Sequence, residues 1–191
     1  MKSFIDELEQ HRETMNNLAS CNGVIEAAAE LLINTLQQSG KILLCGNGGS
    51  AADCQHIAAE FVVRYEKKRR ALAAIALTTD SSILTAHAND FDFDTVFSRQ
   101  VEALGNANDC LIAISTSGNS GNVLKAVTAA RAKGMTVIAL TGGTGGDLLE
   151  HAMLAVIVPS TVTARIQEAH ILIGHYWCGV VEERLSVSDN A

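Results

Sequence analysis

The sequence predicts an α/β fold, a three-layer sandwich around a five-stranded parallel sheet with a helical hairpin at its N-terminus. Two observations predict it. Beyond residue 40, short apolar runs alternate with segments whose apolar residues recur at three- and four-residue spacing, as strands alternate with helices. The runs are continuously apolar, which is typical of strands covered on both faces, and helices between them give right-handed crossovers and hence a parallel sheet.

The first 38 residues are predicted to form two helices, over residues 3–19 and 22–38, joined at a short polar stretch. Gly40 follows them and suits the C-terminal cap of the second helix. We expect residues 1–38 to pack on the core and in an oligomer, and residues 39–191 to form the main part of what is a single structural domain.

The later elements follow in order along the chain. The predicted strands are Lys41–Cys45, Ala73–Thr79, Cys110–Ser115, Thr136–Thr141 and Leu154–Val158, and helical patterns run over residues 122–133 and 163–185. In open parallel sheets ligands bind beyond the carboxyl ends of the strands, near the point where the strand order reverses. The loops that follow the strands should therefore share one functional edge.

Composition limits the classes of partner. The formal net charge of −7 argues against nucleic acid or an anionic membrane, and the basic run Lys67–Arg70 is interpreted as a solvated loop. No stretch reaches the roughly eighteen apolar residues of a membrane span. Apolar residues make up 48% and charged residues only 18%, which leaves apolar surface for subunit contacts, so an oligomer is expected. Five cysteines without paired spacing indicate a reduced, cytoplasmic protein.

Ser115–Ser120 is the most informative segment, with the sequence Ser-Thr-Ser-Gly-Asn-Ser between a strand and a helix. Backbone N–H groups at a helix start bind anions, and hydroxyls add donors without adding charge. We interpret the turn as a phosphate site; the alternative is a hydroxyl-rich helix cap.

A glycine-rich loop, Cys45–Ala51, follows the first strand and opens the next helix. Glycines allow a ligand to approach the backbone closely because no Cβ intervenes. Gly46, Gly48 and Ala51 formally match a dinucleotide-binding fingerprint, but Asp80 comes about ten residues later than its acidic residue should. A third glycine-rich turn, Thr141–Gly146, is interpreted as structural.

His56 and Glu60 are four residues apart on the helix after this loop, about 40° around its axis, so they share one face. Such a pair can ligate one metal or place a base beside a polarising group, and it can also be an exposed polar pair. The functional interpretation gains weight because this helix begins at the ligand edge. Cys54 lies on nearly the opposite side and is excluded as a partner of His56.

Polar residues interrupt the apolar pattern of the last helix, among them Gln167, Glu168, His170 and His175. Gln167 and His175 are eight residues apart, a rise of roughly 12 Å, so one helix brings both to a small centre only by long reach or by bending near Gly174. Our hypothesis is a shared site to which a neighbouring subunit contributes one of these residues. Asn89 and Asp90, after the helix that follows the second strand, either bind sugar hydroxyls or cap a turn.

Four segments together closely resemble the phosphoheptose isomerases of the sugar-isomerase (SIS) fold family: Gly46–Ser50, His56 with Glu60, Ser115–Ser120 and Arg165–His170. The resemblance implies a SIS fold, which is flavodoxin/Rossmann-like. It also implies conversion of sedoheptulose 7-phosphate to D-glycero-D-manno-heptose 7-phosphate on the way to the heptose of the lipopolysaccharide core. A homotetramer with active sites at its interfaces and one zinc ion per subunit is implied as well.

Site residues follow from the same resemblance. Zinc would be held by His56, Glu60, Gln167 and His175. The implied substrate-binding residues are Asn47, Gly48, Gly49, Ser50, Glu60, Asn89, Asp90, Ser115, Thr116, Ser117, Ser120 and Gln167. For the proton transfer of ketose–aldose isomerisation, Glu60 is the candidate base and His175 the candidate acid.

Three alternatives remain open. Some SIS relatives are not enzymes, and one branch binds a replication-initiator protein; that branch lacks the acidic and histidine positions, so Glu60 and His175 favour catalysis here. A non-catalytic module that binds a sugar phosphate is the related possibility. The third is an isomerase of pentose or hexose phosphates. The identity of the metal is a separate open point, because a nitrogen and oxygen donor set also suits nickel or cobalt.

Overall fold

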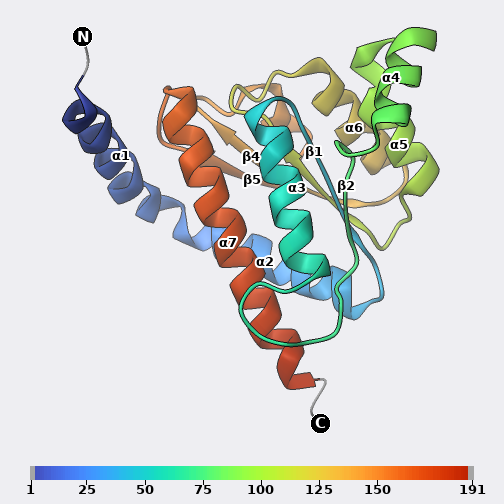
Figure 1. The fold of residues 1–191 in the computed structure, drawn as a ribbon, viewed down its shortest axis with the longest axis horizontal. Coiled ribbons are helices and arrows are strands. Elements are labelled where there is room, and N and C mark those ends of the chain that lie inside the picture. Colours follow the sequence, from blue (N-terminus) through green and yellow to red (C-terminus); the bar gives the residue numbers. More distant parts are fainter. Residues whose placement is uncertain (1–2, 189–191) are drawn as a thin grey trace.

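The computed structural model describes residues 3–188 (Figure 1). Its helices are α1 (Phe4–Leu18), α2 (Asn22–Gln37), α3 (Gly49–Val62), α4 (Ser81–Asp90), α5 (Val96–Leu104), α6 (Gly121–Ala132) and α7 (Thr163–Ser188). The strands are β1 (Ile42–Gly46), β2 (Ala74–Ala76), β3 (Cys110–Ile114), β4 (Thr136–Gly142) and β5 (Leu154–Val158). Short 3₁₀ helices are η1 (Ala19–Cys21), η2 (Phe93–Thr95) and η3 (Gly146–Glu150).

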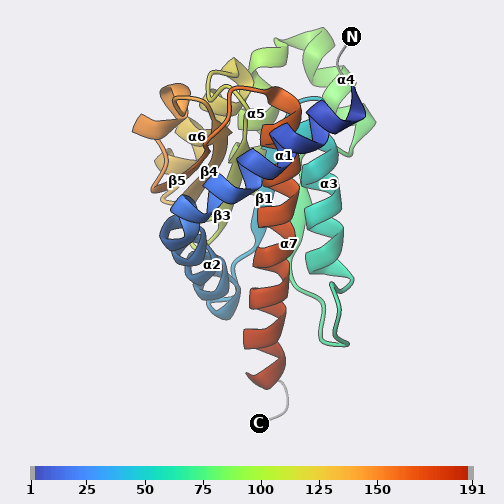
Figure 2. The same ribbon diagram turned by 90° about the vertical axis from the view of Figure 1, so that its left-hand side faces the viewer.

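The five strands form one parallel sheet in the order β2-β1-β3-β4-β5, as predicted. Helices α2, α3 and α7 cover one face and α5 and α6 the other, which gives the three layers visible in Figures 1 and 2. Along β1, Ile42 and Leu44 point into the first layer, whereas Leu43 and Cys45 point into the second; all four are fully buried. The continuous apolar run thus reflects a strand covered on both faces.

The second strand is shorter than predicted. Residues 73–79 were expected in the sheet, but only Ala74–Ala76 pair with β1. This strand lies at the edge of the sheet, and Ile75 is 38% exposed there. After one more bond, from Leu77 N–H to the Leu44 carbonyl, the chain leaves the sheet towards α4.

The two N-terminal helices are present, but they do not turn back on each other as a tight hairpin would. The backbone stays right-handed helical at Leu18, Ala19 and Asn22, so η1 bends the chain without reversing it. Helices α1 and α2 each pack against α7, and α2 also covers the sheet at β5 (Figure 2). The boundary at residues 38/39 stays a prediction, because α2 shares a hydrophobic core with the sheet.

Helix α2 ends in a Schellman motif, one residue earlier than the sequence indicated. Ser39 N–H donates to the Leu36 carbonyl and Gly40 N–H to the Thr35 carbonyl, and Ser39 holds the left-handed position with φ 61°. Gly40 is needed for a different reason: a Cβ there would lie 2.2 Å from the Asn108 carbonyl oxygen.

The strand order reverses between β1 and β3. Helix α3 follows β1 on one face of the sheet and α6 follows β3 on the other, so their N-termini lie on either side of the sheet at its carboxyl edge. This is the position where ligands bind in sheets of this topology. Within residues 3–188, no helix has the length and apolar character needed to cross a bilayer.

Candidate active site

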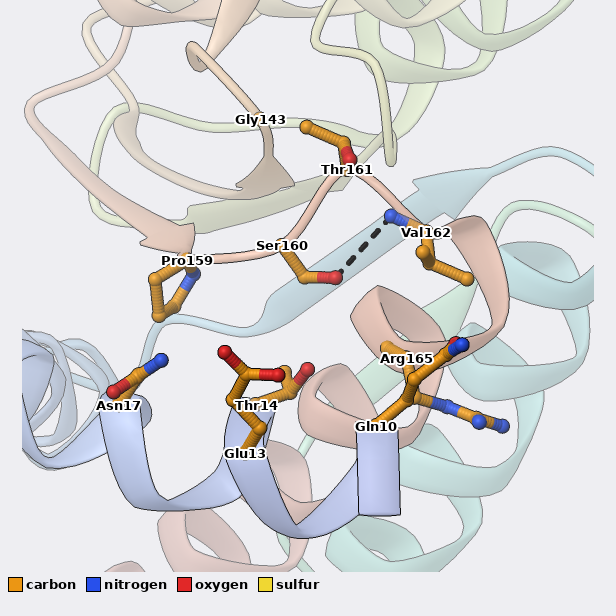
Figure 3. A pocket seen from close by; sticks show the side chains of 10 residues that line it. All are labelled: Gln10, Glu13, Thr14, Asn17, Gly143, Pro159, Ser160, Thr161, Val162 and Arg165. Carbon is orange, nitrogen blue, oxygen red and sulfur yellow. Dashed lines mark hydrogen bonds between the residues drawn. The ribbon is translucent and has the colours of Figure 1, made fainter. Parts of the chain in front are cut away.

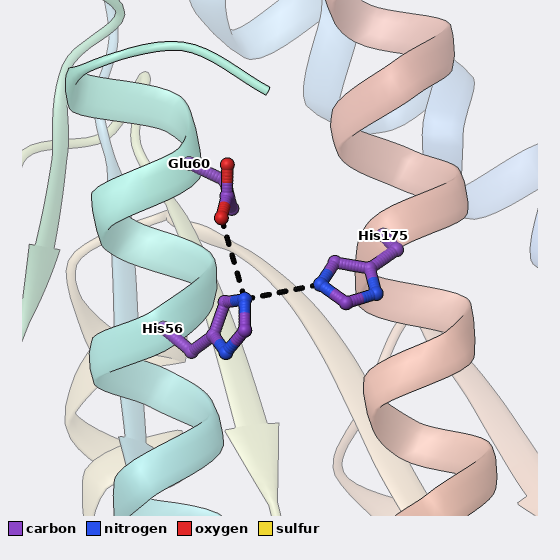
Figure 4. Close-up of side chains that lie close together, drawn as sticks. All are labelled: His56, Glu60 and His175. Atoms are coloured by element: carbon purple, nitrogen blue, oxygen red, sulfur yellow. Dashed lines mark hydrogen bonds and ion pairs between the residues drawn. The ribbon is translucent and has the colours of Figure 1, made fainter. Parts of the chain in front are cut away.

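Three predicted metal ligands meet between α3 and α7 (Figure 4). His56 and Glu60 project from one face of α3, and His175 faces them from α7. The two histidine Nε2 atoms are 3.0 Å apart, and His56 Nε2 lies 3.3 Å from Glu60 Oε1. One donor atom from each residue falls within 4.8 Å of the others, which is a compact set of two nitrogens and one oxygen.

A glycine brings the two helices close enough for this meeting. A Cβ on Gly174 would lie 2.5 Å from Ile57 Cδ1, so α7 packs closely against α3 beside His175. Helix α7 continues without interruption through this point. Close packing, rather than a bend at Gly174, therefore places His175.

The cluster opens to solvent in the single chain. The His56 side chain is 48% exposed and that of Glu60 is 24% exposed. His56 comes seven residues after Gly49, so it lies roughly 10 Å along α3 from the carboxyl edge. The sequence placed this helix at the ligand edge; the structure adds that only its first turn is there.

Gln167 lies apart from the other predicted metal ligands of the same chain. Its side-chain amide occupies the space where a Cβ of Gly49 would be, 2.4 Å from Nε2. Gln167 thus sits at the start of α3, while His175, eight residues further along α7, reaches His56. A small metal centre in this chain accommodates His175 and leaves Gln167 at the ligand edge.

The Ser115–Ser120 turn has a fixed shape. Ser115 and Ser120 hydroxyls are hydrogen-bonded at 2.9 Å, and Gly118 adopts a left-handed φ of 71°. A Cβ on Gly118 would lie 1.9 Å from the Gly145 carbonyl oxygen, and Leu148 N–H donates to the Gly118 carbonyl. The glycine-rich turn after β4 therefore supports this turn, in keeping with its structural interpretation.

The serine turn and the glycine loop each lead into a helix with no side-chain cap. Gly48 precedes α3 and Ser120 precedes α6, and neither accepts a capping hydrogen bond, whereas Ser3 and Asp80 cap α1 and α4. The first N–H groups of an uncapped helix need an external acceptor. Two helix N-termini without a side-chain cap thus lie at the carboxyl edge of the sheet, and an anion is one acceptor that such ends can take.

A reciprocal pair of amides joins the glycine loop to the first turn of α6. Asn47 Nδ2 donates to Asn122 Oδ1, and Asn122 Nδ2 donates to Asn47 Oδ1, both at 2.8 Å. Asn122 was not among the predicted site residues, although its position directly after the serine turn is a usable signal. Ser50 is buried in the first turn of α3, while Thr116 is half-buried and Ser117 exposed.

Asn89 and Asp90 occupy the last turn of α4 rather than the loop after it. Both are exposed, and Asn89 Nδ2 donates to Asp90 Oδ1 at 2.8 Å. The side chain of His87, one turn earlier, bonds Thr95 Oγ1 at 2.8 Å and stacks on Phe91, which fixes the end of this helix. Their role in binding sugar hydroxyls stays a prediction.

The start of α7 is tied to α1 by charged groups. Arg165 donates to the carboxylates of Glu7 and Glu168, and His11 Nδ1 contacts Glu168 at 2.8 Å. Burial raises the pKa of Glu168, but bonds from His11 and Arg165 outweigh it and hold that pKa below its usual value. A cavity of about 380 Å³ lies beside this network, between α1 and the β5–α7 connection (Figure 3).

The loop after α3 contains residues that the sequence did not identify. Arg69 was interpreted as part of a solvated basic run, but its side chain is only 1% exposed and lies 3.1 Å from Glu182 of α7. Tyr65 stacks on His175, with ring centroids 5.5 Å apart. Nothing in the sequence pairs residue 69 with residue 182, because that contact depends on how the loop folds.

Two other polar residues from the sequence analysis are buried away from the cluster. Cys54 belongs to the hydrophobic core, in keeping with its exclusion as a ligand. His170 is fully buried, and its Nε2 lies 3.2 Å from the Thr141 carbonyl oxygen. Burial lowers the pKa of His170 to about 4, partly offset by that carbonyl.

Comparison with known proteins identifies the family. The SIS domain family matches residues 4–142. A phosphoheptose isomerase from Roseiflexus sp. (strain RS-1) is 52% identical over 185 residues, covering 95% of this chain and 92% of that protein.

Solved structures agree with this match. A phosphoheptose isomerase from Francisella tularensis superposes with a TM-score of 0.90 at 38% identity, covering 95% of this chain and all of that one. The enzyme from Neisseria gonorrhoeae gives a TM-score of 0.88 at 47% identity, covering 93% and 95%. The chain therefore belongs to the phosphoheptose isomerase family of SIS-domain proteins.

Proposed function

We propose that this chain isomerises sedoheptulose 7-phosphate to D-glycero-D-manno-heptose 7-phosphate through an enediolate, in the heptose biosynthesis that serves the lipopolysaccharide core. The observation that carries the proposal is the meeting of His56, Glu60 and His175 in a chain that is about half identical to phosphoheptose isomerases. A non-catalytic SIS module has no need of a base and an acid held so close together.

The cluster fits a zinc ion. Imidazole nitrogens and a carboxylate oxygen are the donors zinc prefers, and Nε2 atoms directed at one another across 3.0 Å suit a shared cation. His56, Glu60 and His175 would hold it, and the ion would polarise carbonyl and hydroxyl oxygens of the sugar. The same donors also suit nickel or cobalt. Metal analysis of the purified protein distinguishes them.

Isomerisation moves a proton between the first two carbons of the sugar. Glu60 is proposed to remove it as the base, and His175 to protonate the neighbouring oxygen as the acid. Their side chains point toward one another between α3 and α7, so they can act on adjacent atoms (Figure 4). Each positioned proton transfer contributes about 10²–10⁴-fold to the rate.

The phosphate is proposed to bind at the carboxyl edge of the sheet, between the N-termini of α3 and α6. Uncapped N-termini of α3 and α6 and the hydroxyls of the serine turn supply donors, and Ser115, Thr116, Ser117 and Ser120 are the proposed contacts. Asn47, Gly48, Gly49, Ser50, Asn89 and Asp90 are proposed to bind the rest of the substrate. Binding energy from the unreactive phosphate then positions the reacting carbons.

We further propose a homotetramer with shared sites. The cluster is half-exposed in the single chain, and Gln167 lies at the other end of the site, so a fourth ligand is proposed to come from the Gln167 of a neighbouring subunit. Exposed apolar residues such as Leu172 and Tyr176 on α7 offer surface for such contacts. A cytoplasmic location, supported by five free cysteines, completes the proposal.

The test is incubation with sedoheptulose 7-phosphate, with and without chelator, followed by detection of the aldose product. Glu60→Gln should lower kcat by about 10²–10⁴-fold and leave sugar-phosphate binding nearly intact. Near-normal turnover in that variant would remove Glu60 from the role of base. Activity of an enforced monomer, compared with the oligomer after gel filtration, tests the shared site; a fully active monomer rules it out.

A further inference from the structure

A buried carboxylate on α7 organises the loop that follows α3. Glu182 is 1% exposed, and its oxygens accept hydrogen bonds from the backbone N–H groups of Tyr65, Glu66 and Lys67. Arg69 Nε lies 3.1 Å from the same carboxylate. One side chain of α7 thus contacts four of the five loop residues 65–69.

Arg69 extends this arrangement to the end of α3. Its guanidinium donates to the carbonyl oxygens of Glu60 at 2.8 Å and Phe61 at 2.9 Å. These carbonyls belong to the last turn of α3, where a helix has no internal partner for them. Glu182 therefore acts through Arg69 on the backbone of Glu60, the proposed base.

Tyr65 extends the arrangement to the other side of the cluster. Its N–H bonds Glu182, and its ring stacks on the imidazole of His175 with an interplanar angle of 26°. The Tyr65 ring also lies beside Gly179, where a Cβ would be in van der Waals contact with Tyr65 Cε1 at 3.4 Å. His175 and Glu182 are seven residues apart on one face of α7, so the loop lies directly alongside the imidazole.

The surroundings of Glu182 suit a residue that fixes the arrangement of its partners. Burial raises the pKa of its carboxyl, yet the three backbone donors and Arg69 outweigh burial and hold the pKa below its usual value. A buried ion pair is a weak source of stability compared with apolar packing, whereas it fixes its partners in one arrangement.

We propose that Glu182 is a positioning residue for the His56/Glu60/His175 cluster, holding loop 63–72 so that Arg69 fixes the end of α3 at Glu60 and Tyr65 fixes the ring of His175. This inference rests on the proposed function where it predicts kcat and KM. Its predictions for loop cleavage and zinc affinity do not depend on the substrate.

The test compares Glu182→Gln with Asp109→Asn in the full-length protein. Asp109 is a matched control: it is 3% exposed, accepts backbone N–H groups of Lys41 and Asn106, pairs with Lys41 Nζ, and lies before β3, away from the cluster. Three quantities are measured for each variant: the rate of trypsin cleavage at Lys67–Arg70, the affinity for Zn²⁺ alone by chelator competition, and kcat with KM.

Glu182→Gln should speed cleavage of the basic run and lower zinc affinity or kcat by about 10–100-fold, with KM nearly unchanged. Asp109→Asn should lower the free energy of unfolding, as loss of a buried carboxylate does, but leave the cleavage rate, the zinc affinity and kcat within about twofold of wild type. Equal losses in both variants would overturn the proposal, as would a cleaved loop with unaltered kcat and zinc affinity. A wild type without isomerase activity contradicts the proposed function alone, because cleavage and zinc binding still decide this one.

Tyr65→Leu serves if Glu182→Gln does not fold. It removes the ring from His175 but keeps the N–H that bonds Glu182, so the loop should stay resistant to trypsin while kcat falls. Tyr65→Phe should restore kcat, because the stacked ring is regained. Wild-type kcat in Tyr65→Leu would contradict the positioning of His175 by this loop.

Discussion

Replacement of His170 by glutamine should remove a pH dependence of stability that burial of this histidine creates. In the folded chain His170 is fully buried, and its Nδ1 has no hydrogen-bond partner among the described residues. Its pKa is lowered to about 4 by burial, against about 6.5 in an unfolded chain. Glutamine can keep a donor near the Thr141 carbonyl and carries no titratable group.

The sign follows from the two pKa values. Between pH 6.5 and pH 4 the unfolded chain binds a proton on His170 that the folded chain excludes, so stability falls as the pH falls through this window. The full difference corresponds to about 3.4 kcal/mol, of which about 2 kcal/mol is lost between pH 7 and pH 5. Above pH 7 the contribution is essentially constant.

Urea unfolding at several pH values measures this effect. Trp177 is the single tryptophan, is fully buried and donates to the Ile25 carbonyl, so its fluorescence reports unfolding of the core. Wild type and His170→Gln are compared with chelator present and at one protein concentration, because metal and subunit contacts add their own linkage. The stability of wild type minus that of the variant should fall by about 2 kcal/mol from pH 7 to pH 5. A difference that stays constant with pH would refute this reasoning.

Three further predictions concern the site. Ser117→Ala should raise KM about tenfold in steady-state assays and leave kcat nearly unchanged, because it removes a hydrogen-bond donor to the substrate phosphate, which does not react. A loss confined to kcat would contradict the proposed role of Ser117 in phosphate binding. Gly118→Ala should lower the free energy of unfolding in urea by more than about 2 kcal/mol, because its Cβ would meet a backbone oxygen. Gly143 has a similar φ but open space around the Cβ position, so Gly143→Ala should lower it by only about 1–2 kcal/mol. Gly174→Ala should weaken zinc binding by separating α7 from α3, because its Cβ would meet both Cδ1 and Cγ1 of Ile57. Adding Ile57→Ala, which removes both atoms, should restore the zinc affinity; an unchanged affinity of Gly174→Ala in chelator competition would show that the helices need not touch there.

The sheet and its helices were predictable because each depends on local patterns. Fully apolar runs marked β1, β3, β4 and β5. Burial on both faces bears this out for β1, β3 and β4, whereas β5 lies at the edge of the sheet and is only partly buried. The second strand was overestimated, since hydrophobicity alone does not distinguish an edge strand of three residues from the apolar chain that leaves it. The bend between α1 and α2 depends on packing against α7, which local sequence does not encode.

The site was predictable in its chemistry and only partly in its arrangement. Helical spacing placed His56 beside Glu60, but the approach of His175 depends on the fit of Gly174 against Ile57, a contact across 117 positions of the chain. The separation of Gln167 from His175 followed from helical rise alone. Tyr65, Arg69 and Glu182 carry no motif, and only the folded loop makes them neighbours.

The paired amides of Asn47 and Asn122 have a mechanical consequence. Each amide donates one hydrogen bond and accepts one. Sliding the glycine loop past the start of α6 therefore breaks two hydrogen bonds at once. Rotating one amide alone places oxygen against oxygen and NH₂ against NH₂. The glycine loop and the start of α6 are thereby held in register. Under the proposed function, little ordering of this region remains to be done when the sugar phosphate binds, so the affinity should depend mainly on the fit of the substrate.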